Sequence, residues 1–201
     1  ESRQTQTVVK GVTYDKSQLY TTEGGVDVHI LKIDLTNPNL SVKPVESSVE
    51  IGLKETVQSL IGTNGAVAGV NSAYFGLQGS YSASFGPVVA EGELISVGTD
   101  KNVSKNEFAT YFLDEYGSSF MDYARVELEF LNNGESNLSF ASVNKITEMK
   151  YPIYFDRNGG RDTSALDKRF GGLVKIVVED EEITYISQKG ETVTVPEDGY
   201  L

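Results

Sequence analysis

The sequence predicts an α+β fold built mainly of antiparallel sheet, with several hairpins and one clear helix at about residues 50–62. Short apolar segments are repeatedly separated by Gly, Asn and Pro, which is the pattern of strands joined by turns. One stretch places its apolar residues at helical spacing. The 201 residues, 39% of them hydrophobic, can bury one core, and no repeat or linker divides them. We therefore expect a single domain over residues 1–201.

The first expected strand covers Val26 to Leu35. Its apolar residues move from even to odd positions near Ile30, which indicates either a bulge or a strand covered on both faces. Residues 37–39, with the sequence NPN, predict a turn. Residues 40–45 predict a second strand, which Pro44 would restrict to an edge because proline has no N–H to donate.

The expected helix is marked by apolar residues on one stripe: Leu53, Val57, Leu60 and Ile61. Ser47 and Glu50 have the spacing of a capping box, and Gly62 and Gly65 can end the helix. Residues 66–70, AVAGV, are small and apolar, which suits a strand buried on both faces.

Four hairpins are expected after this segment because paired strand patterns flank turn residues. They are 88–90 with 93–95, 108–113 with a partner beginning near 119, 126–131 with 135–140, and 173–178 with 183–187. Residues 193–196 predict a last short strand.

The charge balance argues against binding of nucleic acid. The chain carries 17 basic and 29 acidic side chains, a formal net charge of −12, and its basic residues are scattered. No apolar stretch approaches the roughly 18 residues that a membrane span requires. We therefore expect neither a nucleic-acid partner nor a membrane span.

Cysteine is absent, which excludes disulfides, thiolate nucleophiles and thiolate metal sites. Its absence is compatible with a bacterial extracellular or surface protein, and also with many cytosolic proteins. His29 is the only histidine, so zinc sites built on several imidazoles within this chain are excluded as well. It could act as an acid or base, but a partly buried strand histidine is the simpler interpretation.

Asn71 is the first candidate for a functional side chain. It follows the expected buried strand at 66–70, and its amide can donate to and accept from a sugar hydroxyl or a phosphate oxygen. A turn asparagine bonded to its own backbone is the alternative. Tyr74 and Phe75 could stack on a sugar or pack in the core.

The loop at 156–167 offers two further kinds of site. Its oxygen-bearing side chains have spacing similar to a calcium loop, although Arg161 occupies the position where such loops have glycine. These candidate ligands are Asp156, Asn158, Asp162 and Asp167. Arg157 and Arg161 could instead hold a phosphate, and solvated charges that neutralise one another are the third possibility.

Several passages in order carry a resemblance to a known family. They are HILKIDL at 29–35, AVAGV followed by NSAYF at 66–75, GPVVAEGELI at 86–95, VN at 143–144, IYF at 153–155, Thr163, LVKIVV at 173–178 and VPEDGY at 195–200. Over about residues 10–201 the chain resembles the phosphodiester glycosidase family. That family includes the N-acetylglucosamine-1-phosphodiester α-N-acetylglucosaminidase known as the uncovering enzyme.

The resemblance implies a secreted bacterial hydrolase that cleaves sugar-1-phosphodiesters of cell-wall or exopolysaccharide material. It implies a catalytic role for Asn71 and substrate contacts by Asn144 and Thr163. With these we group Ser72, Tyr74 and Arg157 as candidate substrate-binding residues, and calcium as the only candidate cofactor.

Two departures from the family pattern matter. Ser72 and Ala73 stand where the family has two glycines, and the sequence contains none of the family's later half with its Arg-containing strand and Asp-Gly-Gly loop. We therefore expect the N-terminal half of a catalytic domain, inactive alone and completed in cis or by a second chain. A non-catalytic glycan-binding or structural β-rich module is the alternative, and a calcium-stabilised surface domain a third.

Overall fold

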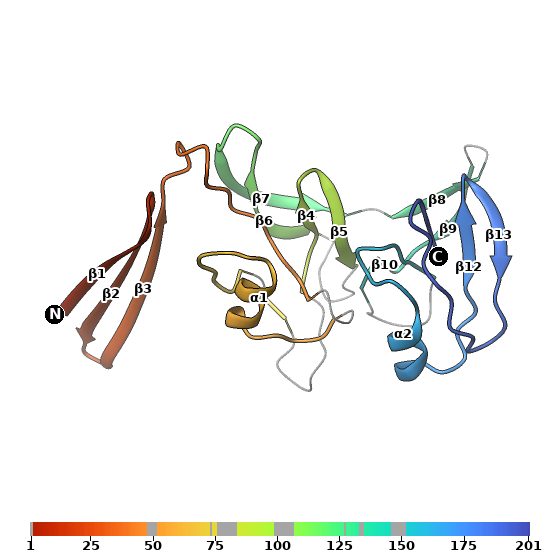
Figure 1. Ribbon diagram of the computed structural model, residues 1–201, viewed down its shortest axis with the longest axis horizontal. Helices are drawn as coiled ribbons and strands as arrows, with labels where there is room; N and C mark the ends of the chain where they lie inside the picture. The colour runs from red at the N-terminus through yellow and green to blue at the C-terminus, as the bar shows by residue number, and fades with distance from the viewer. Residues whose placement is uncertain are drawn as a thin grey trace. The chain divides into compact units, whose positions relative to one another are not determined.

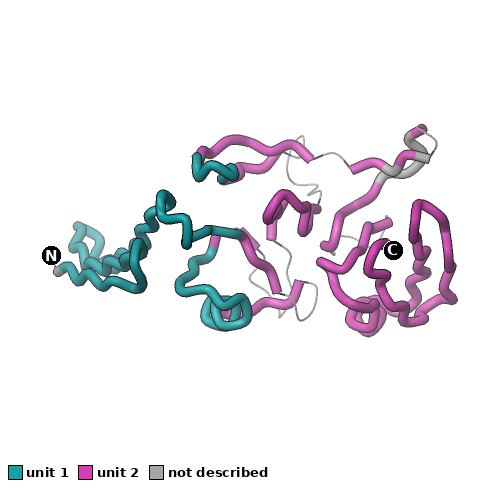
Figure 2. The backbone as a smooth tube through the Cα atoms, turned by 45° about the horizontal axis from the view of Figure 1, so that its top comes forward, with its two compact units in different colours: residues 1–43, 57–71, 113–119 teal, residues 44–56, 72–112, 120–201 magenta. Residues whose placement is uncertain are grey.

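A computed structural model describes residues 2–47, 52–72, 74–75, 84–98, 107–126, 128–132, 135–145 and 152–201 (Figure 1). These residues are mainly β, with five sheets and two short helices. The chain forms two compact units (Figure 2). Unit 1 comprises residues 1–43, 57–71 and 113–119, and unit 2 comprises 44–56, 72–112 and 120–201.

Unit 1 begins with a three-stranded antiparallel sheet of β1 (Ser2–Val9), β2 (Val12–Thr21) and β3 (Gly24–Ile33). The β2–β3 register runs without a shift from Val12 opposite Ile33 to Thr21 opposite Gly24. The predicted bulge or two-sided burial near Ile30 is therefore wrong, and Ile30 is 43% exposed. Because little of β3 is buried, apolar side chains can change faces along this strand without interrupting its pairing.

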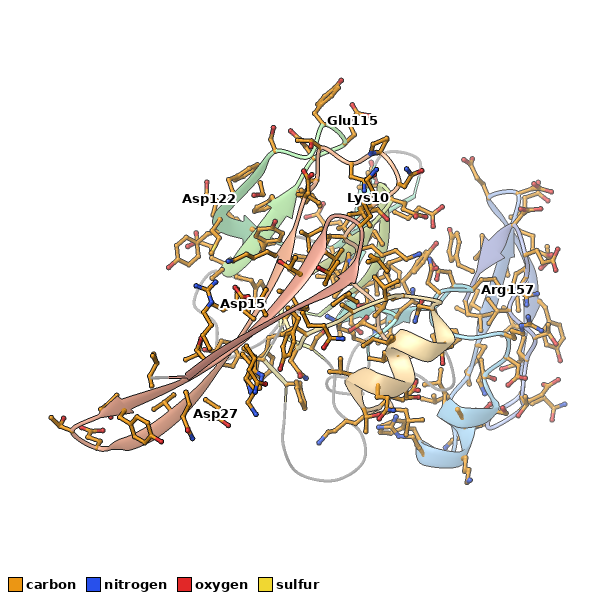
Figure 3. All side chains as sticks on the ribbon, turned by 60° about the vertical axis from the view of Figure 1, so that its left-hand side comes forward. Lys10, Asp15, Asp27, Glu115, Asp122 and Arg157 are labelled. Carbon is orange, nitrogen blue, oxygen red and sulfur yellow. The ribbon has the colours of Figure 1, made fainter. Side chains whose placement is uncertain are left out.

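Asp15 lies at the centre of this sheet and is 2% exposed (Figure 3). Its carboxylate pairs with Lys32 of β3 at 2.8 Å and with Arg3 of β1 at 2.7 Å, and it accepts a hydrogen bond from Thr5 at 2.6 Å. These donors, Lys32 foremost, hold the pKa of Asp15 well below its usual range. A polar contact therefore joins all three strands where an apolar core would ordinarily do so.

We expect Asp15→Asn to speed hydrogen exchange of the β1–β3 amides at neutral pH, because asparagine cannot pair with two cations. A carboxylate whose pKa is lower in the folded state stabilises above its unfolded pKa, and this contribution disappears as pH falls below about 4. The difference between parent and variant should therefore shrink in acid. Asp27→Asn is the control, since Asp27 is exposed and its pair with Lys16 spans 3.8 Å. Equal exchange in both variants would contradict the role given to Asp15.

The predicted helix at about 50–62 is present as α1 (Val57–Thr63), but residues 52–56 before it are not helical. Gly52 has φ +70°, which a right-handed helix cannot contain, and no described residue before Val57 is helical. Ser47 is described, whereas its proposed capping partner at position 50 lies outside the described residues. The expected end at Gly65 is confirmed: with φ +61° it closes a Schellman motif in which Ala66 N–H donates to Ile61 O at 3.0 Å.

Three predicted strands are absent from the structure. Residues 66–70 form no strand and are mostly exposed, with Val70 at 76%, because no described strand pairs with them. Residues 40–45 also form no strand, as Pro44 removes a donor and Val42 stays 41% exposed. At 193–196, Thr194 makes only an isolated bridge, to Asp162, because Pro196 and the following turn end any ladder.

The four predicted hairpins are confirmed. They are β4 (Val88–Ala90) with β5 (Glu93–Gly98), β6 (Glu107–Leu113) with β7 (Ser119–Arg125), β8 (Glu129–Asn132) with β9 (Glu135–Ser139), and β12 (Ile176–Glu179) with β13 (Glu182–Ile186). The β4–β5 turn has positive φ at Glu91 and Gly92, and the β12–β13 turn at Asp180 and Glu181. Positive φ at both turn residues matches the twist of paired strands.

The centre of unit 2 is a four-stranded sheet in the order β11-β10-β5-β4, with β10 at Ser142–Val143 and β11 at Ile153–Tyr154. Strand β10 runs antiparallel to β5 and parallel to β11. Val143 of β10 belongs to a buried apolar cluster with Val97, Phe108 and Val126. This sheet brings residues near positions 95, 143 and 155 together.

A second cluster lies in the C-terminal part of unit 2 and contains Phe155, Leu166 and Val195. Leu166 belongs to helix α2 (Ser164–Arg169), which the sequence did not predict because it is too short for a clear apolar period. Strand β14 (Gly199–Tyr200) pairs with β12 and is the last strand of the chain. Leu201 packs on Phe155 and exchanges two backbone hydrogen bonds with it, at 3.0 and 2.8 Å.

Candidate functional site

Asn144 follows β10 and lies at the junction of three segments. It is 4% exposed, with φ +49°, a conformation that asparagine tolerates better than most residues. Its amide nitrogen donates to Ile95 O at 2.8 Å and to Asp156 Oδ1 at 2.7 Å, and its amide oxygen accepts from the Asp156 N–H at 3.0 Å. Asn144 therefore fixes Asp156 against β5 and β10.

Asp156 lines a hollow of about 510 Å³ within unit 2, which we call the Asp156 hollow. Its lining residues are Leu94, Leu128, Glu129, Leu131, Phe140, Val143, Tyr154, Asp156 and Tyr200. Most of them are apolar or aromatic, with two carboxylates and two phenol hydroxyls among them. A hollow of this size and lining suits a small organic ligand.

Tyr154 and Tyr200 form an aromatic pair in the wall of this hollow. Their ring centroids are 4.6 Å apart and the ring planes differ by 29°. Burial, with the nearby charge of Asp156 and with Tyr200, raises the pKa of Tyr154. The Tyr154 hydroxyl therefore keeps its proton at neutral pH and can donate a hydrogen bond.

The Asp156 carboxylate has one oxygen that its neighbours leave open. Both hydrogen bonds to the carboxylate, from the Asn144 side-chain amide at 2.7 Å and from the Asn158 N–H at 2.8 Å, go to Oδ1. Within the described part of the chain, Oδ2 has no hydrogen-bond partner, and no fully buried side-chain polar atom lacks one. Oδ2 is therefore accessible and can accept a hydrogen bond from a ligand.

Lys145, next to Asn144, belongs to the framework of this region and was missed by the sequence analysis. It is 2% exposed, and its ammonium donates to the carbonyls of Ser84 at 2.9 Å and Gly86 at 2.6 Å. Burial lowers its pKa to about 8, and the charge of Glu46 opposes that change. Glu46 in turn accepts hydrogen bonds from the hydroxyls of Ser84 and Ser96. These residues are far apart in the sequence, so no local motif predicts that they interact.

The candidates near position 71 are on the surface. Asn71 is exposed in unit 1, which corrects the expectation that it ends a buried strand. Ser72 and Tyr74 belong to unit 2 and are also exposed, Tyr74 at 86%. Phe75 is 37% exposed, and the Lys54 ammonium lies 5.8 Å from its ring centroid. Neither aromatic residue packs in a core.

Arg157 and Thr163 differ in what they can contact. Arg157, labelled in Figure 3, is half-buried and donates from Nε to Pro196 O at 3.2 Å. Thr163 is fully buried, donates to Asp167 at 2.7 Å and accepts from Val193 N–H at 2.9 Å. Thr163 therefore supports the fold in this structure, whereas Arg157 retains further donors.

The four candidate calcium ligands do not converge. Asp156 bonds Asn144, Asp162 accepts from Ser164 N–H at 2.8 Å, and Asp167 pairs with the buried ammonium of Lys175. Asn158 is exposed at the tip of the loop. Among the described residues, no three His, Cys, Asp or Glu side chains are placed to hold a metal ion. The spacing resembles a calcium loop, but helix α2 directs Asp167 toward Lys175.

His29 lies on the sheet of unit 1. It is exposed rather than partly buried, and its Nδ1 shares a hydrogen bond with the Tyr14 hydroxyl. The two rings stack with centroids 5.8 Å apart.

None of the helices that the structure describes is long and apolar enough to cross a membrane.

Comparison with known proteins defines the fold alone. No family model matches the chain, and no curated protein matches it significantly. A crystal structure of a hypothetical protein from Synechocystis is similar over 100% of this chain, with a TM-score of 0.67 and 15% sequence identity. The match covers 36% of that protein, so this chain spans about a third of its length. This β-rich fold is therefore shared with part of a larger protein.

Proposed function

We propose that this chain is part of a secreted bacterial hydrolase that cleaves sugar-1-phosphodiester bonds, such as those of N-acetylglucosamine-1-phosphodiesters in cell-wall or exopolysaccharide material. One observation supports this proposal most strongly. Asn144, a residue of the family resemblance, fixes a carboxylate in a hollow that also contains an aromatic pair. Aromatic faces and carboxylate acceptors are the groups that bind the faces and hydroxyls of sugars.

Cleavage of a sugar-1-phosphodiester needs little general-acid catalysis, because phosphate is a good leaving group. The bond from the anomeric carbon to the phosphate oxygen breaks, water adds at that carbon, and phosphate leaves readily with its electron pair. The protein must hold the sugar and stabilise the anomeric centre. We assign Asn71 to donate to the phosphate or a sugar hydroxyl, and further polypeptide, in cis or as a second chain, to supply the remaining catalytic groups.

The test uses the longest natural protein that contains residues 1–201. We expect Asn71→Ala to lower the release of sugar from an aryl sugar phosphodiester about tenfold or more, the effect of losing one good hydrogen bond in the transition state. Asn39→Ala is the control, because Asn39 is also exposed in unit 1 and its side-chain amide makes only a 3.4 Å contact, with the side-chain oxygen of Asn37. An Asn71 variant within about twofold of the parent would show that Asn71 is not a catalytic residue.

A non-catalytic glycan-binding module is the second candidate, and the lining of the Asp156 hollow favours it. The described residues that line the hollow include Glu129 and Asp156 but no Lys or Arg, and their negative charge would repel a phosphate. Sugar binding at the hollow without turnover of any sugar phosphodiester by the natural protein would support the module and overturn the hydrolase.

A further inference from the structure

The Asp156 hollow holds two carboxylates, Glu129 and Asp156, that pair with no cation in the described part of the chain. Neither Glu129 nor Asp156 forms an ion pair with any residue that the structure describes. Among the described residues that line the hollow there is no Lys or Arg, and the ammonium of neighbouring Lys145 is bound to the carbonyls of Ser84 and Gly86. A negative field in a partly apolar hollow attracts a cation more strongly than the same charges would in open water.

The aromatic walls favour the same kind of ligand. An ammonium group near the face of a tyrosine is attracted by the negative face of the ring. Tyr154 and Tyr200 provide such faces beside Asp156, and the raised pKa of Tyr154 keeps that ring neutral. Together with the open Oδ2 of Asp156, the hollow can surround one positive group with acceptors and rings.

We propose that the Asp156 hollow is a subsite for a sugar ring that carries a free amino group, with Glu129 and Asp156 binding the ammonium and the two tyrosines covering the ring. The inference rests on the proposed function for the sugar, and it adds the charge of that sugar. The phosphate of a sugar-1-phosphodiester would then lie outside the hollow. Glu129 becomes a specificity residue, because it is exposed on β8 and its side chain makes no hydrogen bond or ion pair with the described residues.

Nuclear magnetic resonance titration of the 201-residue chain tests this directly. The probes are glucosamine and methyl glucoside at equal ionic strength, in mildly acidic buffer that keeps the amine of glucosamine protonated. We expect glucosamine to bind about tenfold more tightly, the effect of one partly desolvated charge interaction. Shifted signals should come from residues of the hollow, Tyr154 and Tyr200 among them, and added salt should reduce the difference.

Matched variants separate the hollow from the general acidity of the protein. Glu129→Gln should weaken glucosamine about fivefold or more and leave methyl glucoside unchanged. Glu182→Gln changes the net charge equally on another exposed strand, β13, and should have no effect. Tyr200→Leu should weaken both sugars, because it removes one aromatic face but keeps an apolar side chain.

Several results would overturn the inference. They are equal affinity for the two sugars, binding of neither sugar, shifted signals outside the hollow, or equal losses from Glu129→Gln and Glu182→Gln. Hydrolysis is measured separately on the natural protein. Turnover of sugar phosphodiesters without the preference for amines would overturn this inference alone, whereas the preference without turnover would overturn the hydrolase alone.

Discussion

Gly159→Ala should release Asn144 from Asp156 and destabilise unit 2 by about 3 kcal/mol. A Cβ at position 159 would lie 2.5 Å from Asn144 Oδ1 and 2.6 Å from Phe155 Cε2. Neither neighbour can move freely. The Asn144 amide is held by three hydrogen bonds, and Phe155, 3% exposed, belongs to a buried cluster.

Urea denaturation gives the loss of stability, and the side-chain amide signals of Asn144 report its hydrogen bonds. Gly171→Ala is the control, because no described residue other than its chain neighbours comes within 4 Å of a Cβ at that position. It should unfold like the parent. If both variants denature alike and the Asn144 signals keep their positions, the close packing at Gly159 does not maintain the site.

Lys175→Met should lower the free energy of unfolding by about 3–5 kcal/mol, because it leaves the Asp167 carboxylate buried without its cation. The side chains of Lys175 and Asp167 are 5% and 8% exposed and form an ion pair. The ammonium also donates to Glu191 O, and Asp167 accepts from Thr163 at 2.7 Å. Losing the lysine therefore leaves a buried charge with hydroxyl donors alone.

The double variant Lys175→Met with Asp167→Leu should recover much of this loss, since replacing a whole buried pair by apolar residues is often nearly neutral. Lys168→Met, on the exposed side of α2, is the matched control. Its free energy of unfolding should lie within about 0.5 kcal/mol of that of the parent. Melting curves measured by circular dichroism would contradict the assignment if the single variant matched the parent, or if the double variant were as unstable as the single.

The hairpins could be predicted from the sequence because their signals are local. A turn such as Glu91-Gly92 requires positive φ, and the paired apolar residues lie within a few positions of it. The strand expected at 66–70 failed for the opposite reason. Small apolar residues permit burial on both faces, but a strand also needs a neighbouring strand to pair with. The sequence of the segment does not show which strand that would be.

The strands β1 and β2 were missed because no apolar alternation marks them. Thr, Gln and Ser occupy most of β1, and Asp15, the residue that ties the sheet together, reads in sequence as a solvated charge. Its burial depends on Arg3 and Lys32, which lie 12 and 17 positions away on the neighbouring strands.

The candidate site could be predicted only in part. The resemblance indicated Asn144, and the oxygen spacing drew attention to Asp156 as one member of a calcium loop, a grouping that the described residues do not form. Glu129 and Tyr200 were missed because β8 and β14 are far apart in sequence and reach the hollow only through the fold. Sequence spacing cannot reveal a wall that several distant elements share.

The division of the chain into units has a consequence for inheritance. Unit 1 takes its segments from residues 1–43, 57–71 and 113–119, so each unit is interrupted by stretches of the other. Modules that recombine between genes are usually continuous and bounded by exposed linkers. Neither unit can be transferred by exchange of a single stretch of coding sequence. We therefore expect the two to be gained, lost and duplicated together.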